Sequence, residues 1–449
     1  MNAQVASATL FDRLRHLTGS VLRGDRPLFA LLQSVGTQVL VLCANLGTGV
    51  IMARLLGPQG RGEFTAVSIW PLLLALVATA GMNGAIVFRM RRSEAEAGRV
   101  VGAALIAGLA FAVLTAGAGV LLIPALLSQY SPSLVRFAQF CLVSVLVNTV
   151  SLIVKQAYAG AGEYSRGNFS NLLPQVLQLL ALLALLPFGL LTARNAVLSL
   201  LVTGFIALLL VLPGFVRRIR PRLRGAWSEL PALLSYTGRG SLNDVVYAVA
   251  FHLDRIVLIP LLNPAELGLY AVAFAFSRVI QLAQPAVISV FLSQLSHRKP
   301  GEGKVLHDHA MRYLLASMTA ACIVLWFIGE RLLTFTFGAE FAAANTIFRL
   351  LVIEAALSVL SQVSIQLFLA HDRPGLVSAL QVATLGLSLL CLLILVPMYG
   401  AVGAAIALLI AGIARWLALI VAMRGALGLT LPRFLLNRED LRYMLGKLR

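Results

Sequence analysis

The chain has 449 residues, of which 59% are hydrophobic and only 12% are charged. A soluble globular protein carries about 25% charged residues, so this composition excludes an ordinary soluble domain. The net charge of +18 is divided among short segments between apolar stretches, which leaves no continuous basic face for a nucleic acid. Many apolar stretches reach the roughly 20 residues needed to cross a bilayer. The sequence therefore predicts a polytopic membrane protein.

Twelve long apolar stretches follow one another along the chain. Only helices and closed barrels can span a bilayer, and barrel strands would be about ten residues long with strict alternation. The apolar stretches are longer and lack a period of two. We therefore expect an all-α polytopic membrane protein with about 12 transmembrane helices. The predicted spans are 31–53, 64–88, 99–125, 136–158, 168–189, 195–214, 241–262, 266–293, 311–329, 343–368, 375–397 and 400–422.

The distribution of basic residues predicts the orientation in the membrane. With the N-terminus inside, 25 of the 36 Lys and Arg residues lie in inside segments and five lie outside. Lys and Arg are enriched in cytoplasmic segments, so both termini are predicted to be cytoplasmic. The longest segments between spans are 215–240 and 294–310, which leaves no room for a separate soluble domain.

A sequence repeat with an offset of 206 residues divides the chain into two halves. Leu55-Leu56-Gly57-Pro58, followed by Gly62 and Phe64, aligns with Leu261-Leu262-Asn263-Pro264, followed by Gly268 and Tyr270. Asn263 departs from the pattern, because the first half has Gly57. Two parallel six-helix repeats around a central cavity are a common transporter plan. The predicted segments are a cytoplasmic N-terminal segment 1–30, an N-terminal bundle 31–214, a basic connector 215–240, a C-terminal bundle 241–422 and a cytoplasmic tail 423–449.

Polar residues form stripes along paired spans, which indicates that the two halves enclose a wet cavity. Residues 3, 4, 7 and 11 positions apart share a helix face, and a charge at the bilayer centre costs roughly 2.5–3.5 kcal/mol. The candidate substrate-binding residues are Gln38 and Asn45 on the first span, Asn148 and Lys155 on the fourth, Asn243, Tyr247 and Arg255 on the seventh, and Arg278 on the eighth. The carboxylates Asp244, Asp254 and Glu354 are candidate coupling-ion sites.

Each ionisable residue inside a span also has a structural interpretation. Arg255 and Arg278 either present a cation to an anionic substrate or pair with a charge across the bundle. Lys155 either lines the cavity or extends its ammonium group toward the interface. Packing or snorkelling is favoured for Arg349 and Arg415. The carboxylates either bind a coupling ion or neutralise a nearby Arg or Lys.

Other patterns that carry chemistry are weak. His307-Asp308-His309 lies in a basic connector with no third ligand in view, so we expect a solvated loop and no metal site. The four cysteines are scattered through apolar stretches without metal-binding spacing. No P-loop motif occurs, which argues against ATP hydrolysis. We therefore expect neither catalysis nor a cofactor. Any energy that transport requires should come from an ion gradient or from a partner protein.

Several motifs resemble those of a known transporter family. Ala53-Arg54-Leu55-Leu56-Gly57-Pro58 with Gly62-Glu63-Phe64 is similar to the first external turn of polysaccharide transporters. These are lipid-linked oligosaccharide (O-antigen type) flippases of the multidrug/oligosaccharidyl-lipid/polysaccharide (MOP) exporter superfamily. Leu253-Asp254-Arg255-Ile256-Val257 with residues 264–272 resembles the equivalent in the second half. Gln156-Ala157-Tyr158-Ala159-Gly160 with Gly162-Glu163-Tyr164, and Gly403-Ala404-Ala405-Ile406, also fit.

The resemblance implies two six-helix bundles in a V shape around a cationic cavity. Such a protein moves undecaprenyl-pyrophosphate-linked oligosaccharide from the cytoplasmic to the outer leaflet of the bacterial inner membrane by alternating access. Its product serves surface polysaccharide such as the O-antigen of lipopolysaccharide. The implied partners are this substrate, bilayer lipid and the enzymes of polysaccharide assembly. The alternative is a proton- or sodium-coupled multidrug antiporter of the same fold.

Overall fold

The computed structural model describes residues 27–92, 96–281, 300–371 and 373–427 of the chain. The described N-terminal half contains α2 (Pro27–Ala78), α3 (Met82–Arg92), α4 (Ala97–Leu126), α5 (Pro132–Cys141), α6 (Ser144–Gly160), α7 (Tyr164–Leu185) and α8 (Ala193–Ile219). The described C-terminal half contains α9 (Ala226–Leu261), α10 (Pro264–Ser277), the 3-10 helices η2 (Arg278–Gln281) and η3 (Ala339–Ala344), α12 (Pro300–Phe337), α13 (Asn345–Ala370) and α14 (Pro374–Leu427). No strand occurs among these residues, and the all-α prediction is confirmed.

Eight helical stretches of the described chain are long and apolar enough to cross a membrane. One of them, Gly375–Ala426, contains the two predicted spans 375–397 and 400–422, and another, Gly36–Ala78, contains most of the predicted spans 31–53 and 64–88. In each of these stretches, two helical segments follow one another across a sharp bend. The bend lies at Gly57 (φ 63°) in α2 and at Gly400 (φ 58°) in α14. A positive φ costs glycine little because it has no Cβ. The predicted seventh and eighth spans correspond to α9 and to α10 with η2.

Two predicted spans are interrupted in the structure. The predicted span 64–88 breaks between α2 and α3, where Gly81 has a φ of 75°. The predicted span 136–158 consists of α5 and α6, which are separated by residues 142–143. Of the predicted eighth span, residues 282–293 lie outside the described residues. The length of the apolar stretches predicted these helical spans but not the short irregular segments inside them.

The predicted connectors are partly helical. Within 215–240, α8 continues to Ile219 and α9 begins at Ala226. Residues 300–310 form the first turns of α12, so the solvated loop predicted for His307-Asp308-His309 is wrong. The His307 side chain is only 1% exposed. Its Nε2 lies 3.5 Å from the hydroxyl of Ser364 on α13, which explains why a polar residue of this segment is buried.

The sequence repeat places two glycines against each other. A Cβ on Gly62 would overlap the carbonyl oxygen of Pro264, and a Cβ on Gly268 would overlap the carbonyl oxygen of Pro58. Gly62 and Pro58 precede their counterparts, Gly268 and Pro264, by the repeat offset of 206 residues. The contact is therefore reciprocal, as expected of two similar units related by an approximate two-fold axis. Such a close backbone approach requires glycine at both positions.

Asn263, which departs from the repeat pattern, is the N-cap residue of α10. Its side-chain oxygen accepts a hydrogen bond from the backbone nitrogen of Glu266 at 2.9 Å, and Pro264 follows in the first turn. Asn is a preferred N-cap residue, and Pro fits the first helical position. The equivalent Gly57 lies in a bend that does not end α2. The two halves therefore make the same turn with different residues.

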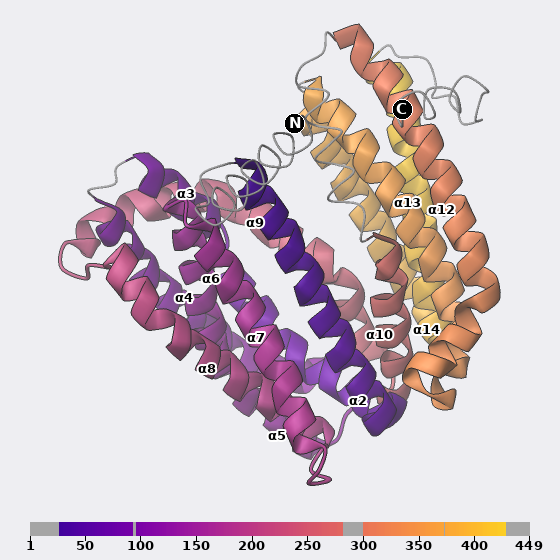
Figure 1. The fold of residues 1–449 in the computed structure, drawn as a ribbon, viewed down its shortest axis with the longest axis horizontal. Coiled ribbons are helices and arrows are strands. Elements are labelled where there is room, and N and C mark those ends of the chain that lie inside the picture. The colour runs from indigo at the N-terminus through magenta and orange to yellow at the C-terminus, as the bar shows by residue number, and fades with distance from the viewer. Residues whose placement is uncertain (1–26, 93–95, 282–299, 372, 428–449) are drawn as a thin grey trace, which may run out of the picture.

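The two halves meet at one end and spread apart toward the other (Figure 1). At the joined end, the bend of α2 contacts α10, α12 and η3. Nε of Arg54 donates to the carbonyl of Thr336 at 2.8 Å, and its Nη2 donates to the carbonyl of Phe335, both in the last turn of α12. In the predicted orientation this joined end faces outward.

Candidate functional site

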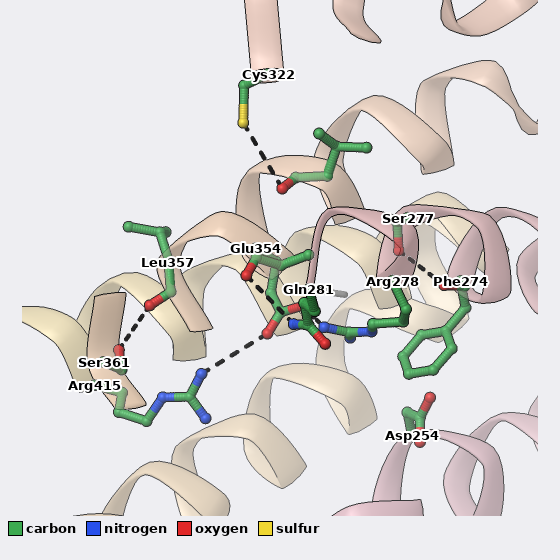
Figure 2. A network of polar contacts seen from close by, with 12 residues as sticks. Asp254, Phe274, Ser277, Arg278, Gln281, Cys322, Glu354, Leu357, Ser361 and Arg415 are labelled. Atoms are coloured by element: carbon green, nitrogen blue, oxygen red, sulfur yellow. Dashed lines mark hydrogen bonds and ion pairs between the residues drawn. The ribbon is translucent and has the colours of Figure 1, made fainter. Parts of the chain in front are cut away.

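An ion-pair network links three helices of the C-terminal half. Arg278 lies at the junction of α10 and η2, and its Nη1 is 2.8 Å from Oε2 of Glu354 on α13. Arg415 on α14 approaches the other carboxylate oxygen at 3.9 Å. Figure 2 shows the Glu354 carboxylate between these two guanidinium groups. The Glu354 side chain is only 9% exposed, and a buried carboxylate requires such partners.

Phe274 lies beside two guanidinium groups. The Cζ atom of Arg278, one turn later on the chain, is 4.2 Å from the centre of the Phe274 ring. The Cζ atom of Arg255 on α9 is 5.2 Å from the same ring centre. Both distances fall within the roughly 6 Å range of cation–π attraction. The ring therefore stabilises two like charges close to each other.

Asp254 is the sequence neighbour of Arg255 but has a different partner. The hydroxyl of Tyr270 on α10 donates a hydrogen bond to Oδ2 of Asp254 at 2.9 Å. Both side chains are buried. Adjacent residues on a helix point about 100° apart, so Asp254 and Arg255 face different neighbours. The hydrogen bond supplies Asp254 with a buried partner that is not a cation.

Among the described side chains of this region, positive charge exceeds negative charge. We refer to Arg255, Arg278 and Arg415 as the arginine cluster. The two described carboxylates beside it, Asp254 and Glu354, do not balance its three charges. Arg61 of α2 lies close enough to Arg255 for the two positive charges to interact. Guanidinium groups match the geometry of phosphate and carboxylate oxygens, so this arrangement suits an anionic ligand.

The structure brings four predicted residues together: Arg255, Arg278, Asp254 and Glu354. Arg415, for which the sequence favoured packing or snorkelling, joins them through Glu354. Gly412 of α14 lies beside this carboxylate, because a Cβ there would be in ordinary contact with Cγ of Glu354 at 3.4 Å. Arg349 packs as expected, with its Cζ atom 4.9 Å from the centre of the Trp326 ring.

The other predicted residues lie elsewhere. Lys155 is exposed on α6 and donates to the side-chain oxygen of Asn171 at 3.2 Å. Asn148 on the same helix is partly buried, and Gln38 and Asn45 are exposed on α2. Asn243, Asp244 and Tyr247 lie on α9 in a stretch whose side chains fall outside the described part of the chain. No hydrogen bond or ion pair joins the described members of this set to the arginine cluster.

The motif at residues 156–164 connects helices of the N-terminal half. The carboxylate of Glu163 forms an ion pair with Arg218 at the end of α8. The hydroxyl of Tyr164 accepts a hydrogen bond from Arg91 of α3 at 2.7 Å. These contacts join the ends of α3, α7 and α8, so this motif has a structural explanation.

The fold is similar to those of solved transporters. The lipid II flippase MurJ, in an inward closed conformation, gives a TM-score of 0.71 at 12% identity over 88% of this chain and 87% of that one. The MATE transporter VcmN of Vibrio cholerae gives 0.59 at 16% identity over 91% and 98%. A MOP superfamily transporter from Pyrococcus furiosus gives 0.57 at 16% identity over 91% and 98%. No curated protein is similar enough in sequence to count as a match.

The helical fold of this chain is therefore similar to that of MurJ and of the MATE transporters. The family profile of polysaccharide biosynthesis proteins matches residues 51–346. This range runs from the middle of α2 to the start of α13 and includes both copies of the repeated motif. The chain belongs to this family of polysaccharide biosynthesis proteins.

Proposed function

We propose that this protein flips undecaprenyl-pyrophosphate-linked oligosaccharide from the cytoplasmic to the outer leaflet of the bacterial inner membrane. The observation that carries the proposal is the arginine cluster, whose positive charge exceeds the negative charge of the described carboxylates beside it. The family supports a role in polysaccharide synthesis, and the likeness to MurJ supports a lipid-linked substrate. The undecaprenyl pyrophosphate carrier and an O-antigen type glycan follow from the resemblance of the motifs. The role needs no catalytic residue and no cofactor.

The diphosphate of the substrate is expected to replace Glu354 as the partner of Arg278 and Arg415. Carboxylate and phosphate oxygens both accept paired hydrogen bonds from guanidinium groups, so the two anions compete. Without ligand, Glu354 offsets the cost of burying two arginines. With ligand, the carboxylate is released and becomes able to bind a coupling ion.

The oligosaccharide is expected to contact polar side chains of the N-terminal half. Gln38 and Asn45 on α2 offer exposed amide groups, and Asn148 and Lys155 lie on α6. Amides and ammonium groups are suitable hydrogen-bond partners for sugar hydroxyls. The lipid tail remains in the bilayer, where its apolar surface is already removed from water.

Alternating access would require the two halves to change the end at which they are joined. The contact of Gly62 with Gly268 and the bonds from Arg54 to α12 hold one end together. With both termini in the cytoplasm, this closed end faces outward and the substrate enters from the cytoplasmic side. Release then requires the closed contacts to separate.

A proton- or sodium-coupled multidrug antiporter is the second candidate. The similar MATE fold and the buried carboxylates Asp254 and Glu354 favour it. However, Glu354 is paired with two arginines and Asp254 is bonded to Tyr270. The site therefore presents guanidinium groups to a ligand, and these would repel a cationic drug.

Reconstitution in proteoliposomes tests the proposal. A fluorescent undecaprenyl-pyrophosphate oligosaccharide is incorporated, and its accessibility to an impermeant quencher is followed with and without an ion gradient. If the protein is a flippase, it should exchange the probe between the leaflets. Absence of flipping with several glycans, together with gradient-driven export of a small cation, would overturn the proposal in favour of the antiporter.

A further inference from the structure

A groove of about 700 Å³ opens between α3 and α6 in the N-terminal half. Its lining includes Asn83, Gly84, Phe88, Arg91 and Arg92 of α3 and Gln156 of α6. The groove is separate from the arginine cluster, which lies on α9, η2 and α14. The transport scheme described above does not use it.

The groove follows one open face of α3. Gly84, Phe88 and Arg92 are exposed and lie four residues apart, so they share one side of the helix. Ala85 and Ile86 are fully buried and pack into the core of the N-terminal half. The apolar side of α3 therefore fixes the helix in place, and the opposite side presents a ring, a glycine and a guanidinium group to the groove.

Among the described residues, the two guanidinium groups of the groove have no carboxylate partner. The described carboxylates at this end of the half have other arginines as partners, in the pairs Glu229 with Arg89, Glu163 with Arg218 and Arg166, and Glu96 with Arg99. Arg91 donates to the neutral hydroxyl of Tyr164. Two guanidinium groups side by side in the lining favour an anion.

Uncharged polar groups complete the lining. Asn83 has a buried side-chain oxygen with no hydrogen-bond partner among the described residues, and Gln156 contributes a second amide from α6. The ring of Phe88 is about half exposed. Ligand sites commonly combine apolar walls with a few polar groups of this kind. We infer that the groove is a second binding site, for an anionic head group in which a phosphate adjoins hydroxyl-bearing groups.

The groove lies beside the polar face of α6. Gln156 directly follows Lys155, whose ammonium group bonds to Asn171. In the predicted orientation this end faces the cytoplasm, so the site would hold a head group before it reaches the arginine cluster. The identity of the natural ligand rests on the proposed function, whereas the binding of a diphosphate at this groove does not.

Filling the groove provides the sharpest test. Apart from its chain neighbours and its own helix backbone, nothing lies within 4 Å of a Cβ placed on Gly84, so Gly84→Leu would extend its side chain into the groove and would favour the helix. Arg92→Ala removes one guanidinium group instead. We expect Arg92→Ala to weaken diphosphate binding at the groove about tenfold, the effect of losing a charge-assisted bond. We expect a loss of about the same size in Gly84→Leu, because the added side chain takes the space of the ligand.

Two matched variants control for bulk and for charge. Gly117 on α4 also has open space around its Cβ position, so Gly117→Leu adds the same bulk away from the groove. Arg217 is exposed at the end of α8, and Arg217→Ala removes an equal charge from the same end of the half. Neither change should alter binding at the groove.

Isothermal titration of the purified full chain with geranyl diphosphate, and separately with inorganic diphosphate, measures these effects. In the Arg255→Ala/Arg278→Ala background one site should remain, which Gly84→Leu weakens for both probes. In the otherwise unaltered chain, Gly84→Leu should weaken one of two binding events. Unchanged binding in Gly84→Leu, or equal weakening by Arg217→Ala, would overturn the inference. A failure of the proposed function would appear in the flipping assay and leave this comparison unaffected.

Discussion

Arg278 and Glu354 form a 2.8 Å ion pair between the end of α10 and the middle of α13. The side chains are 21% and 9% exposed, so most of their surface is removed from solvent. Breaking such a pair by removing one partner leaves a poorly solvated charge. Because η2 begins at Arg278, the pair also fixes the path of the chain where it leaves α10. The proposed ligand must act on this ion pair.

Replacing Glu354 should strengthen anion binding and weaken the fold. Glu354→Gln leaves Arg278 and Arg415 without their carboxylate, so an added diphosphate no longer competes with it. We expect geranyl diphosphate to bind about tenfold more tightly, and the free energy of unfolding to fall by about 1–3 kcal/mol. Titration and thermal melting measure the two effects.

A second glutamate serves as the control for this change. Glu330 accepts a hydrogen bond from Asn345 away from the arginine cluster, so Glu330→Gln removes an equal charge without changing affinity. Weaker diphosphate binding in Glu354→Gln would contradict a competitive role for that carboxylate.

Phe274 should be needed for head-group affinity. Phe274→Leu removes the ring that stabilises Arg255 and Arg278, at a cost of about 0.5–2 kcal/mol for each cation–π contact. The two guanidinium groups should then separate, and diphosphate affinity should fall about tenfold. Phe276 is two residues away and packs against other aromatic rings. Phe276→Leu should therefore lower the melting temperature without changing affinity, and equal affinity losses in both variants would refute the positioning role of Phe274.

The two repeat-related glycines should respond alike to substitution. Gly62→Ala and Gly268→Ala each place a methyl group against a carbonyl oxygen of the other half. Overpacking of this kind typically costs about 1–3 kcal/mol, so both variants should melt at lower temperature by similar amounts. Gly204→Ala is the control, because nothing lies within 4 Å of a Cβ there. A large effect at only one of the two glycines would show that the contact is not reciprocal.

The bond between Tyr270 and Asp254 should contribute to stability. Tyr270→Phe leaves the buried carboxylate without its hydroxyl donor, and an unsatisfied buried group costs about 1–3 kcal/mol. Asp254→Asn and the double variant complete a thermodynamic cycle, which we expect to give a coupling energy of at least about 0.5 kcal/mol. Additive losses in melting experiments would show that the two side chains do not act together.

The sequence predicted the helices and the repeat because both depend on local pattern. Long apolar stretches form helices in a bilayer since their backbone groups must be satisfied internally. The repeat offset identified Gly62 and Gly268 as equivalent, and the structure shows them in contact. The breaks at Gly81 and at residues 142–143 were not predicted, because the apolar stretches continue through them.

The sequence identified which charges require explanation but not their partners. Glu354 and Arg415 are 61 residues apart on different helices, so no spacing rule connects them. The buried position of His307 depends in the same way on Ser364 of the packed neighbour α13. Phe274 gave no signal at all, because an aromatic residue in an apolar span is ordinary until two arginines are placed beside it.

We propose that the arginine cluster binds the head group of a lipid-linked oligosaccharide. The most direct measurement compares flipping rates of Arg278→Ala and Arg349→Ala in proteoliposomes with the fluorescent oligosaccharide. Arg349 is a matched control in the same half, because its guanidinium group packs on Trp326. If the arginine cluster binds the head group, the Arg278→Ala variant should flip the probe at least about tenfold more slowly, while the Arg349→Ala variant should remain near the unaltered rate. Flipping at the unaltered rate in the Arg278→Ala variant would rule out this role of the cluster.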